Sequence, residues 1–464
     1  MNSQETLSKA EVQRIRVLTF QAKNKEEETP APLPSCPSAG ERRGRGGSLR
    51  PFTRKVLSNG LTVYVKEVHE TPIVAVYFWA RTGSANEPAE LNGIAHFFEH
   101  MFFKGTEKRG VGEMDRAIKT LGGYNNAFTG MEFTAYYVVV PSEHFATAFD
   151  ILYDAMVHSV FDVNEIERER QVIIEEIHRR DDSPEERLST VFLNEIFAGT
   201  PYARPVLGTL KTLHGIDRKA FLRTLHDFYV PNNVTVVVAG DVATAPVLAQ
   251  IEHATKDWRP DPSVADRCAS ISFVPQTEIR TKAVEMDVHQ TYWMMGFPNR
   301  GRLDLKDMYV LDVASTIFGG GRSSRLYQRL VEREGLVTSV HAWVWALTRA
   351  GIFGIEAQFP PEHHARVEQI IFEEVVRLKD EGVRPEELER AKTMLITGFA
   401  YSNETGADIG ETLGQYATIA TVEEALTYPE RIRAVTGEGI QRAFERYCDF
   451  GAYTLCCIRP NTRS

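Results

Sequence analysis

The chain has 464 residues, of which 43% are hydrophobic and 25% are charged, and its formal net charge is −10. This length predicts two or more domains with ordinary globular cores, and the acidic balance argues against nucleic acid as the main partner. The five cysteines form no Cys-x-x-Cys pair, which argues against a disulfide framework and a cysteine-based zinc site and favours a reducing compartment.

Residues 1–50 have no apolar periodicity and are expected to form a disordered tail. Proline recurs in Pro30–Pro34, and Glu41–Gly47 is rich in arginine and glycine. This Arg-Gly patch could contact nucleic acid or an acidic partner. We favour the simpler interpretation that it is a solvated linker. A short amphipathic helix at Ser8–Phe20 is a further place for a partner to dock. Because no signal-peptide core, presequence or membrane-length apolar run of roughly 20 residues is found, we expect a cytoplasmic protein.

A folded domain is expected to begin at Phe52, with strands and helices in mixed order. The expected elements are strands Leu61–Val65 and Ile73–Trp79, a helix carrying His96 and His100, a helix near Gly112–Leu121, strand Thr134–Val140, a helix near Ser142–His158, a helix at Asn164–Arg180, further helix to Phe197 and strand Val234–Ala239. Long helices laid over an antiparallel-rich sheet indicate an α+β class.

The most informative motif is the run His96-Phe-Phe-Glu99-His100. On a helix, His96 and His100 are one turn apart and point the same way, and Glu99 shares that face. The neighbouring residues are apolar, so two histidines and a carboxylate would be buried at a cost unless something pairs with them. A divalent cation is the preferred partner. The alternative is an ordinary amphipathic helix whose histidines bond to carbonyls of the core.

A second helix, Asn164–Arg180, offers the third ligand. Glu176 lies 76 positions beyond His100 (176 − 100) and has helical apolar neighbours. Two histidines and this carboxylate make a three-ligand zinc site with a fourth position open for water, and Glu99 is placed to take the proton of that water. Glu169 lies seven residues before Glu176 on the same face, so we expect it to orient or charge the site.

A proline-containing linker is expected at 259–279, which divides the chain into a tail (1–50), a zinc-bearing domain (51–258) and a second domain (280–464). The second domain is expected to contain strand Thr291–Met295, helices Leu303–Phe318 and Ser323–Glu334, strands Ser339–Trp345 and Ile352–Gln358, helices Glu362–Asp380 and Pro385–Tyr401, and strand Ala452–Cys457. This order repeats that of the first domain without the His-x-x-Glu-His run. We therefore predict two homologous domains, each a mostly antiparallel sheet covered by long helices, the second a degenerate copy.

At these residues the sequence resembles the inverzincins, the family of pitrilysin, insulysin and mitochondrial processing peptidase. The resemblance covers roughly residues 51–464, and the bacterial members with one pair of repeats per chain are closest in size. It is carried, beyond the zinc motif, by Phe52–Thr62, Gly105–Thr106, Gly122–Thr129, Pro201–Thr209, Tyr229–Asn233, Val236–Asp241 and Gly319–Leu326.

The resemblance implies a zinc metalloendopeptidase that holds one Zn²⁺ per chain through His96, His100 and Glu176. Glu99 is the expected catalytic base, and Glu169 is expected to be a second catalytic residue. In the family two such halves enclose a chamber, so substrates are expected to be short or unfolded peptides, for example precursors or leader peptides that are processed.

The resemblance also predicts where a peptide binds. Asn126 and Ala127 look like residues of an edge strand whose backbone pairs with an extended peptide. Phe103 is also expected to bind substrate. The other interpretation is a tight turn, because glycine and asparagine are ordinary turn residues. We favour function at Asn126 and leave Asn125 open.

One feature departs from the family pattern. Active members carry an Arg and a Tyr, seven apart, in the second half, where they bind substrate and stabilise the oxyanion; here Val331 and Thr338 stand at those places. Arg329 and Arg333 are near but are expected on other faces of the helix. Because some family members divide the site between two subunits, we predict a heterodimer whose other subunit is a homologue with the Arg/Tyr pair; a homodimer is the alternative.

Two other functions are compatible with parts of the sequence. The chain could be a non-catalytic structural or chaperone-like subunit of the same family, but such a scaffold has no need of Glu99. Binding through residues 1–50 is a third possibility, which deletion of that segment would test.

Overall fold

The computed structural model describes residue 49 and residues 51–265 and 271–461. Of the expected tail it describes Leu49 alone, which is buried, so the predictions of disorder, of a helix at Ser8–Phe20 and of an Arg-Gly patch lie outside the described residues. We call residues 51–265 the first half and residues 271–461 the second half. Within these ranges no helix combines the length and the apolar character that a membrane crossing requires.

The first half is built on a mostly antiparallel sheet. Its strands are β1 (Thr53–Val56), β2 (Thr62–Glu67), β3 (Ile73–Ala80), β4 (Tyr124–Thr129), β5 (Thr134–Pro141) and β6 (Val234–Gly240). Their spatial order is β1-β2-β6-β3-β5-β4, and among these pairs only β2 and β6 run parallel. The strand β4, which carries Asn126 and Ala127, therefore forms one edge of the sheet.

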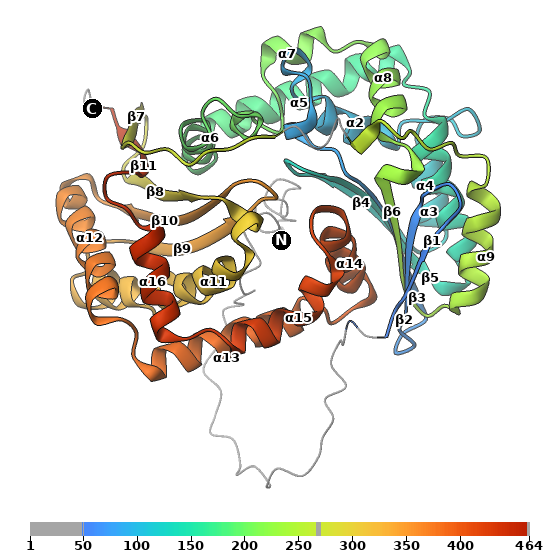
Figure 1. Ribbon diagram of the computed structural model, residues 1–464. Helices are drawn as coiled ribbons and strands as arrows, with labels where there is room; N and C mark the ends of the chain where they lie inside the picture. Colours follow the sequence, from blue (N-terminus) through green and yellow to red (C-terminus); the bar gives the residue numbers. More distant parts are fainter. Residues whose placement is uncertain (1–48, 50, 266–270, 462–464) are drawn as a thin grey trace, which may run out of the picture.

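Helices cover this sheet on the side where the zinc motif lies (Figure 1). They are α2 (Ile94–Phe102), α3 (Glu113–Thr120), α4 (Phe145–His158), α5 (Val163–Asp182), α7 (Leu210–Gly215), α8 (Arg218–Phe228) and α9 (Thr244–Thr255). One further helix of this half, α6 (Pro184–Ile196), packs on the sheet of the second half instead. The central strand β3 explains the apolar run seen in the sequence. Val76 and Phe78 face the helix-covered core, whereas Tyr77 and Trp79 face a second core on the opposite side, so every second residue is buried on each face.

The second half repeats the same strand topology. Its strands are β7 (Arg280–Met286), β8 (Thr291–Asn299), β9 (Ser339–Ala346), β10 (Gly351–Phe359) and β11 (Thr454–Pro460). The order β7-β11-β8-β10-β9, with the pair β7–β11 parallel and the others antiparallel, matches β2-β6-β3-β5-β4 strand for strand. The predicted α+β class with two homologous, mostly antiparallel domains is confirmed.

The second half carries six regular helices among its described residues. They are α11 (Leu305–Gly319), α12 (His364–Glu381), α13 (Pro385–Tyr401), α14 (Gly406–Ile419), α15 (Val422–Arg433) and α16 (Gly437–Tyr447). The prediction of an ordinary helix at Ser323–Glu334 is wrong in detail, because Tyr327–Arg333 is π-helical. Its last turn ends where the amide of Glu334 donates to the carbonyl of Arg329, five residues back.

The two halves exchange one helix each. From the first half, α6 packs on β7, β8 and β11 of the second sheet, where Phe192 and Ile196 share an apolar cluster with Ile352. From the second half, α14 packs on β3 and β6 of the first sheet (Figure 1). This approach is close because Gly414 has no side chain: a Cβ there would lie 1.9 Å from Nε1 of Trp79. The boundaries 51–258, 259–279 and 280–464 stay a prediction.

Candidate metal centre and substrate cavity

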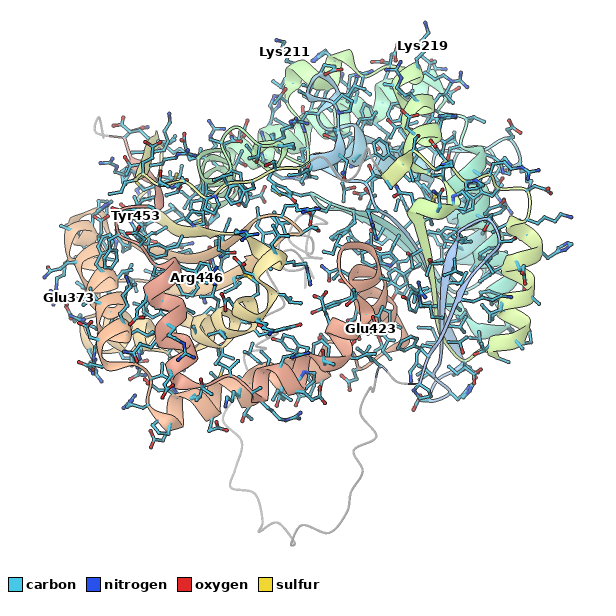
Figure 2. The ribbon with its side chains drawn as sticks, viewed as in Figure 1. Lys211, Lys219, Glu373, Glu423, Arg446 and Tyr453 are labelled. Atoms are coloured by element: carbon cyan, nitrogen blue, oxygen red, sulfur yellow. The ribbon has the colours of Figure 1, made fainter. Side chains whose placement is uncertain are left out.

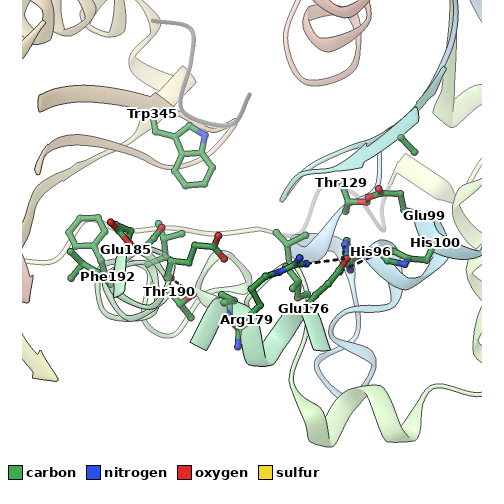
Figure 3. A pocket seen from close by; sticks show the side chains of 18 of the residues that line it. His96, Glu99, His100, Thr129, Glu176, Arg179, Glu185, Thr190, Phe192 and Trp345 are labelled. Carbon is green, nitrogen blue, oxygen red and sulfur yellow. Dashed lines mark hydrogen bonds and ion pairs between the residues drawn. The ribbon is translucent and has the colours of Figure 1, made fainter. Parts of the chain in front are cut away.

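Three of the predicted residues meet between α2 and α5. His96 and His100 lie on α2 with ring centroids 4.7 Å apart. Oε2 of Glu176, from α5, is 3.8 Å from Nε2 of His96 and 3.5 Å from Nε2 of His100. Figure 3 shows these side chains converging at one end of a cavity.

The geometry of this group suits a zinc ion. Donor atoms at about 2.0–2.1 Å from a tetrahedral zinc are separated by about 3.3 Å, and one donor atom from each of the three residues lies within 4.8 Å of the others. His96 is buried, and burial first, then the charge of His100, lowers its pKa to about 3. It is therefore neutral at physiological pH, which is the form of imidazole that binds a metal.

Glu169 contacts the other side of His100. Its Oε2 is 3.0 Å from Nδ1 of His100, and its Oε1 is 2.5 Å from Nζ of Lys104. With a proton on Nδ1 shared with Glu169, His100 keeps Nε2 for a metal. Burial lowers the pKa of His100, but the hydrogen bonds to Glu169 and Glu176 outweigh it and raise the pKa to about 9, so a metal that binds at Nε2 would displace a proton there. The geometry fits the orienting role predicted for Glu169, and that role stays a prediction.

Glu99 is held by a residue that sequence reasoning did not single out. The hydroxyl of Thr129, at the end of β4, donates to Oε2 of Glu99 over 2.7 Å. Thr129 itself is buried, whereas Glu99 faces the cavity beside His96 and His100. In the sequence, Thr129 is only the last residue of the family-like segment Gly122–Thr129. That segment does not indicate that the hydroxyl of Thr129 contacts the carboxylate of Glu99.

The metal centre opens into a cavity of about 610 Å³ between the two halves. Phe103, Asn126 and Ala127, the residues predicted to bind substrate, line it on the side of the metal centre. The opposite wall comes from the second sheet and includes Tyr292 and Trp345, which sequence reasoning missed. In Figure 3, Trp345 projects into the cavity from the second half. The contribution of the second half to a shared cavity was expected, but not which of its residues face it.

The start of α2 is fixed by a buried carboxylate. Glu87 accepts hydrogen bonds from the amides of Gly93 (2.8 Å) and Ala95 (2.7 Å) and from the side chain of Asn92 (2.9 Å). Gly93, at the N-cap, has a φ of 99°, and no side chain of its own caps the helix. Glu87 thus satisfies donors that the first turn leaves free, and burial raises the pKa of its carboxyl to about 8.

We predict that Glu87→Ala lowers the free energy of unfolding by about 2 kcal/mol, since it leaves buried donors without partners. Urea denaturation of the metal-free protein measures this. Glu87→Gln, which keeps an acceptor, should lose less, and Glu90→Ala, an exposed neighbour, should unfold like the wild type. If Glu87→Ala and Glu90→Ala unfold at the same urea concentration, the hydrogen bonds of Glu87 do not stabilise the protein.

The second half brings no arginine or lysine to the described lining of the cavity. The cations that line it are Lys104, Arg179 and Arg180, all from the first half. Val331 packs against the apolar core, and the hydroxyl of Thr338 donates to the carbonyl of Gln358 over 3.1 Å.

The nearby Arg329 is engaged elsewhere. It forms ion pairs with Glu373 and Glu374 of α12 and with Glu334. Figure 2 shows Glu373 at the outer side of the second half, away from the first half. Arg329 is therefore not available to replace the absent arginine.

The fold and the site together define a protein with two homologous α+β halves and an inverted His-x-x-Glu-His motif completed by a distant glutamate. Residues 62–210 match the family model described as insulinase (peptidase family M16), and residues 215–395 match the one described as the peptidase M16 inactive domain. The chain belongs to peptidase family M16, which confirms the resemblance found in the sequence.

Individual relatives agree with this membership. An uncharacterized zinc protease of Rickettsia bellii is 31% identical over 421 residues, which cover 89% of this chain and 98% of that protein. One of Bacillus subtilis is 30% identical over 352 residues, or 76% of this chain and 84% of that protein. Among solved structures, a protease from Helicobacter pylori has a TM-score of 0.84 at 24% identity and covers 88% of this chain and 100% of its own.

Proposed function

We propose that this chain is a zinc-dependent endopeptidase that hydrolyses short or unfolded peptides. The observation that carries the proposal is the meeting of His96, His100 and Glu176 beside Glu99 at the end of one cavity. A structural subunit has no use for an intact ligand set with a carboxylate held next to it. The names of the relatives as zinc proteases support the same function.

The chemistry follows from the positions of the side chains. A zinc ion held by His96, His100 and Glu176 would polarise the scissile carbonyl and lower the pKa of a water molecule toward ~7. Glu99 then accepts the proton of the attacking water and passes it to the leaving amine. Thr129 fixes one oxygen of Glu99 by its hydrogen bond and so holds the carboxylate beside the metal ligands.

The edge strand β4 is the proposed substrate platform. Asn126 and Ala127 line the cavity on this strand, and β5 is its one neighbour among the described strands. An extended peptide can add to such an edge through backbone hydrogen bonds. A cavity of about 610 Å³ between two halves admits an extended segment but not a folded domain.

We further propose that the chain is the zinc-bearing subunit of a heterodimer. The support is that Val331 has no side-chain donor and that Thr338 is too short to replace a tyrosine and donates to the carbonyl of Gln358. In addition, Arg329 is paired with carboxylates. A partner of the same family would supply the missing Arg and Tyr. The alternative is a homodimer of narrower activity.

The test uses the zinc-loaded chain and a labelled unfolded peptide. We expect hydrolysis that a chelator abolishes and added zinc restores, and a rate at least ~10-fold higher when a homologue with the Arg/Tyr pair is present. If the chain alone is as fast as any mixture, the heterodimer is wrong. If no preparation hydrolyses peptide although zinc is bound, the structural-subunit alternative takes the place of the peptidase.

A further inference from the structure

The two sheets touch through matching hairpins. The β4–β5 turn of the first half and the β9–β10 turn of the second occupy equivalent places in the repeated topology. The backbone amide of Thr348, in the second turn, donates to both carboxylate oxygens of Glu132, in the first, at 3.2 and 3.0 Å. The hydroxyl of Tyr202 donates to the same carboxylate over 2.5 Å. We call Glu132, Tyr202 and Thr348 the tip contact.

The tip contact is a buried one. Glu132 is 8% exposed, and its neighbour Met131 packs in an apolar cluster with Phe197 of the first half and Leu347 of the second. A carboxylate in such surroundings is costly unless its hydrogen-bond partners are in place. The position of the β4–β5 turn is therefore tied to the position of the second half.

A short path leads from this turn to Glu99. Thr129, the last residue of β4, stands three positions before Glu132 and donates to Glu99 over 2.7 Å. The turn between them is closed by a hydrogen bond from the amide of Gly130 to the carbonyl of Phe133. Because β4 is an edge strand with β5 as its one sheet neighbour, the place of its end depends strongly on this turn.

We propose that Glu132 is a positioning residue for Glu99. By fixing the β4–β5 turn to the second half, it sets the place of Thr129, and through Thr129 the place of the Glu99 carboxylate. The inference rests on the proposed peptidase function. On this proposal the second half contributes to catalysis. Its backbone N–H at Thr348 fixes the turn that follows β4, and β4 carries the Thr129 that holds Glu99.

The first test compares Glu132→Ala with Thr348→Ala in whichever assembly hydrolyses peptide. Loss of the carboxylate should lower kcat by about 10- to 100-fold, since small displacements of a catalytic group cost rates of that order, while KM and zinc content stay within about threefold of wild type. Thr348→Ala keeps the backbone donor and removes only the long bond of 3.4 Å from its hydroxyl to the carbonyl of Ile419, so its kcat should stay within about threefold of wild type. An unchanged kcat for Glu132→Ala, or a loss confined to KM, overturns the proposal.

A double-mutant cycle tests the path. Thr129→Val removes the hydroxyl and keeps the shape of the side chain. If Glu132 acts through Thr129, the double variant should lose little more than Thr129→Val alone, because coupled residues are not additive. Losses that multiply would mean that Glu132 acts by another route and would overturn the proposal.

Hydrogen exchange separates this proposal from the proposed function. In Glu132→Ala the amides of residues 124–134 should exchange at least ~10-fold faster than in wild type, and those of the more distant β2 and β6 should not change. Tyr202→Phe, which removes one donor only, should give the same pattern in weaker form if Glu132→Ala does not fold. If the wild type has no peptidase activity, the proposed function is wrong. If amide exchange of residues 124–134 is unchanged in both variants, the positioning role of Glu132 is wrong.

Discussion

Glu99→Gln is expected to lower kcat by about 10³-fold or more while the chain keeps its zinc. The substitution removes the group that accepts the proton of the attacking water, and general-base catalysis of this kind contributes about 10²- to 10⁴-fold. The amide oxygen of glutamine can still accept the hydrogen bond from Thr129, so the local structure should survive. Steady-state hydrolysis of a labelled peptide and metal analysis of the same sample measure both quantities.

The control for this experiment is Glu175→Gln. Glu175 lies on α5 next to a proposed ligand, but its side chain is 79% exposed and points away from the site. This variant should retain wild-type kcat and zinc. If Glu99→Gln keeps more than a third of the wild-type kcat, Glu99 is not the base. If it loses zinc together with activity, the carboxylate is part of the metal site instead.

The side-by-side placement of the two histidines could be predicted because it obeys a local rule. His96 and His100 are one helical turn apart in sequence, and α2 has the buried, apolar surroundings that their neighbours indicate. Glu176 lies on a helix, as expected, and the structure brings it to the two histidines. Spacing on a helix is a short-range property, so the sequence is sufficient to place the two histidines together. The approach of Glu176 is a tertiary contact, and metal binding by the three residues stays a prediction.

Thr129 and Trp345 could not be found in this way. The bond from Thr129 to Glu99 joins an edge strand to a helix 30 residues earlier, and Trp345 reaches the cavity from the other half of the chain. Both depend on how sheets and helices pack, which periodicity does not encode. The pairing of Glu132 with Thr348 spans 216 residues and belongs to the same class of contact.

The elements that sequence reasoning missed have their own physical reasons. Helix α14 contains several glycines, which predict turns in isolation, yet its small residues allow it to lie against Tyr77 and Trp79 of the first sheet. Helix α15 contains Pro429, which ordinarily ends a helix. Strand β7 carries several exposed residues because it forms an edge, so it lacks the apolar run that identified β3.

The repeated topology and the exchanged helices make the second half more than a lid over the first. Its α14 supports β3 from behind, and its β9–β10 turn contacts the hairpin that carries Thr129. The described part of the second half thus helps to fix the shape of the cavity. That contribution does not depend on the residues at positions 331 and 338, because it comes from α14 and from the β9–β10 turn.

His100→Ala should abolish both zinc binding and turnover. Two donors, His96 and Glu176, remain, and these are too few for a stable tetrahedral site with an open position. We expect zinc affinity to fall by well over ~100-fold, the upper range for losing a residue that only supports a ligand. Glu169→Gln, which leaves all three ligands but weakens the bond to Nδ1 of His100, should show an intermediate loss of about 10- to 100-fold.

These two variants distinguish the proposed metal ligand, His100, from Glu169, which hydrogen-bonds to it. The two side chains are in contact, but loss of the ligand should lower zinc affinity more than loss of its hydrogen-bond partner. Zinc affinity is measured by competition with a chromophoric chelator, and thermal unfolding of the metal-free proteins controls for stability. His178→Ala, an exposed histidine on α5 whose side chain is 52% accessible, should bind zinc like the wild type. If His100→Ala is purified with about one zinc per chain, or if Glu169→Gln loses more affinity than His100→Ala, the assignment of ligand and support is wrong.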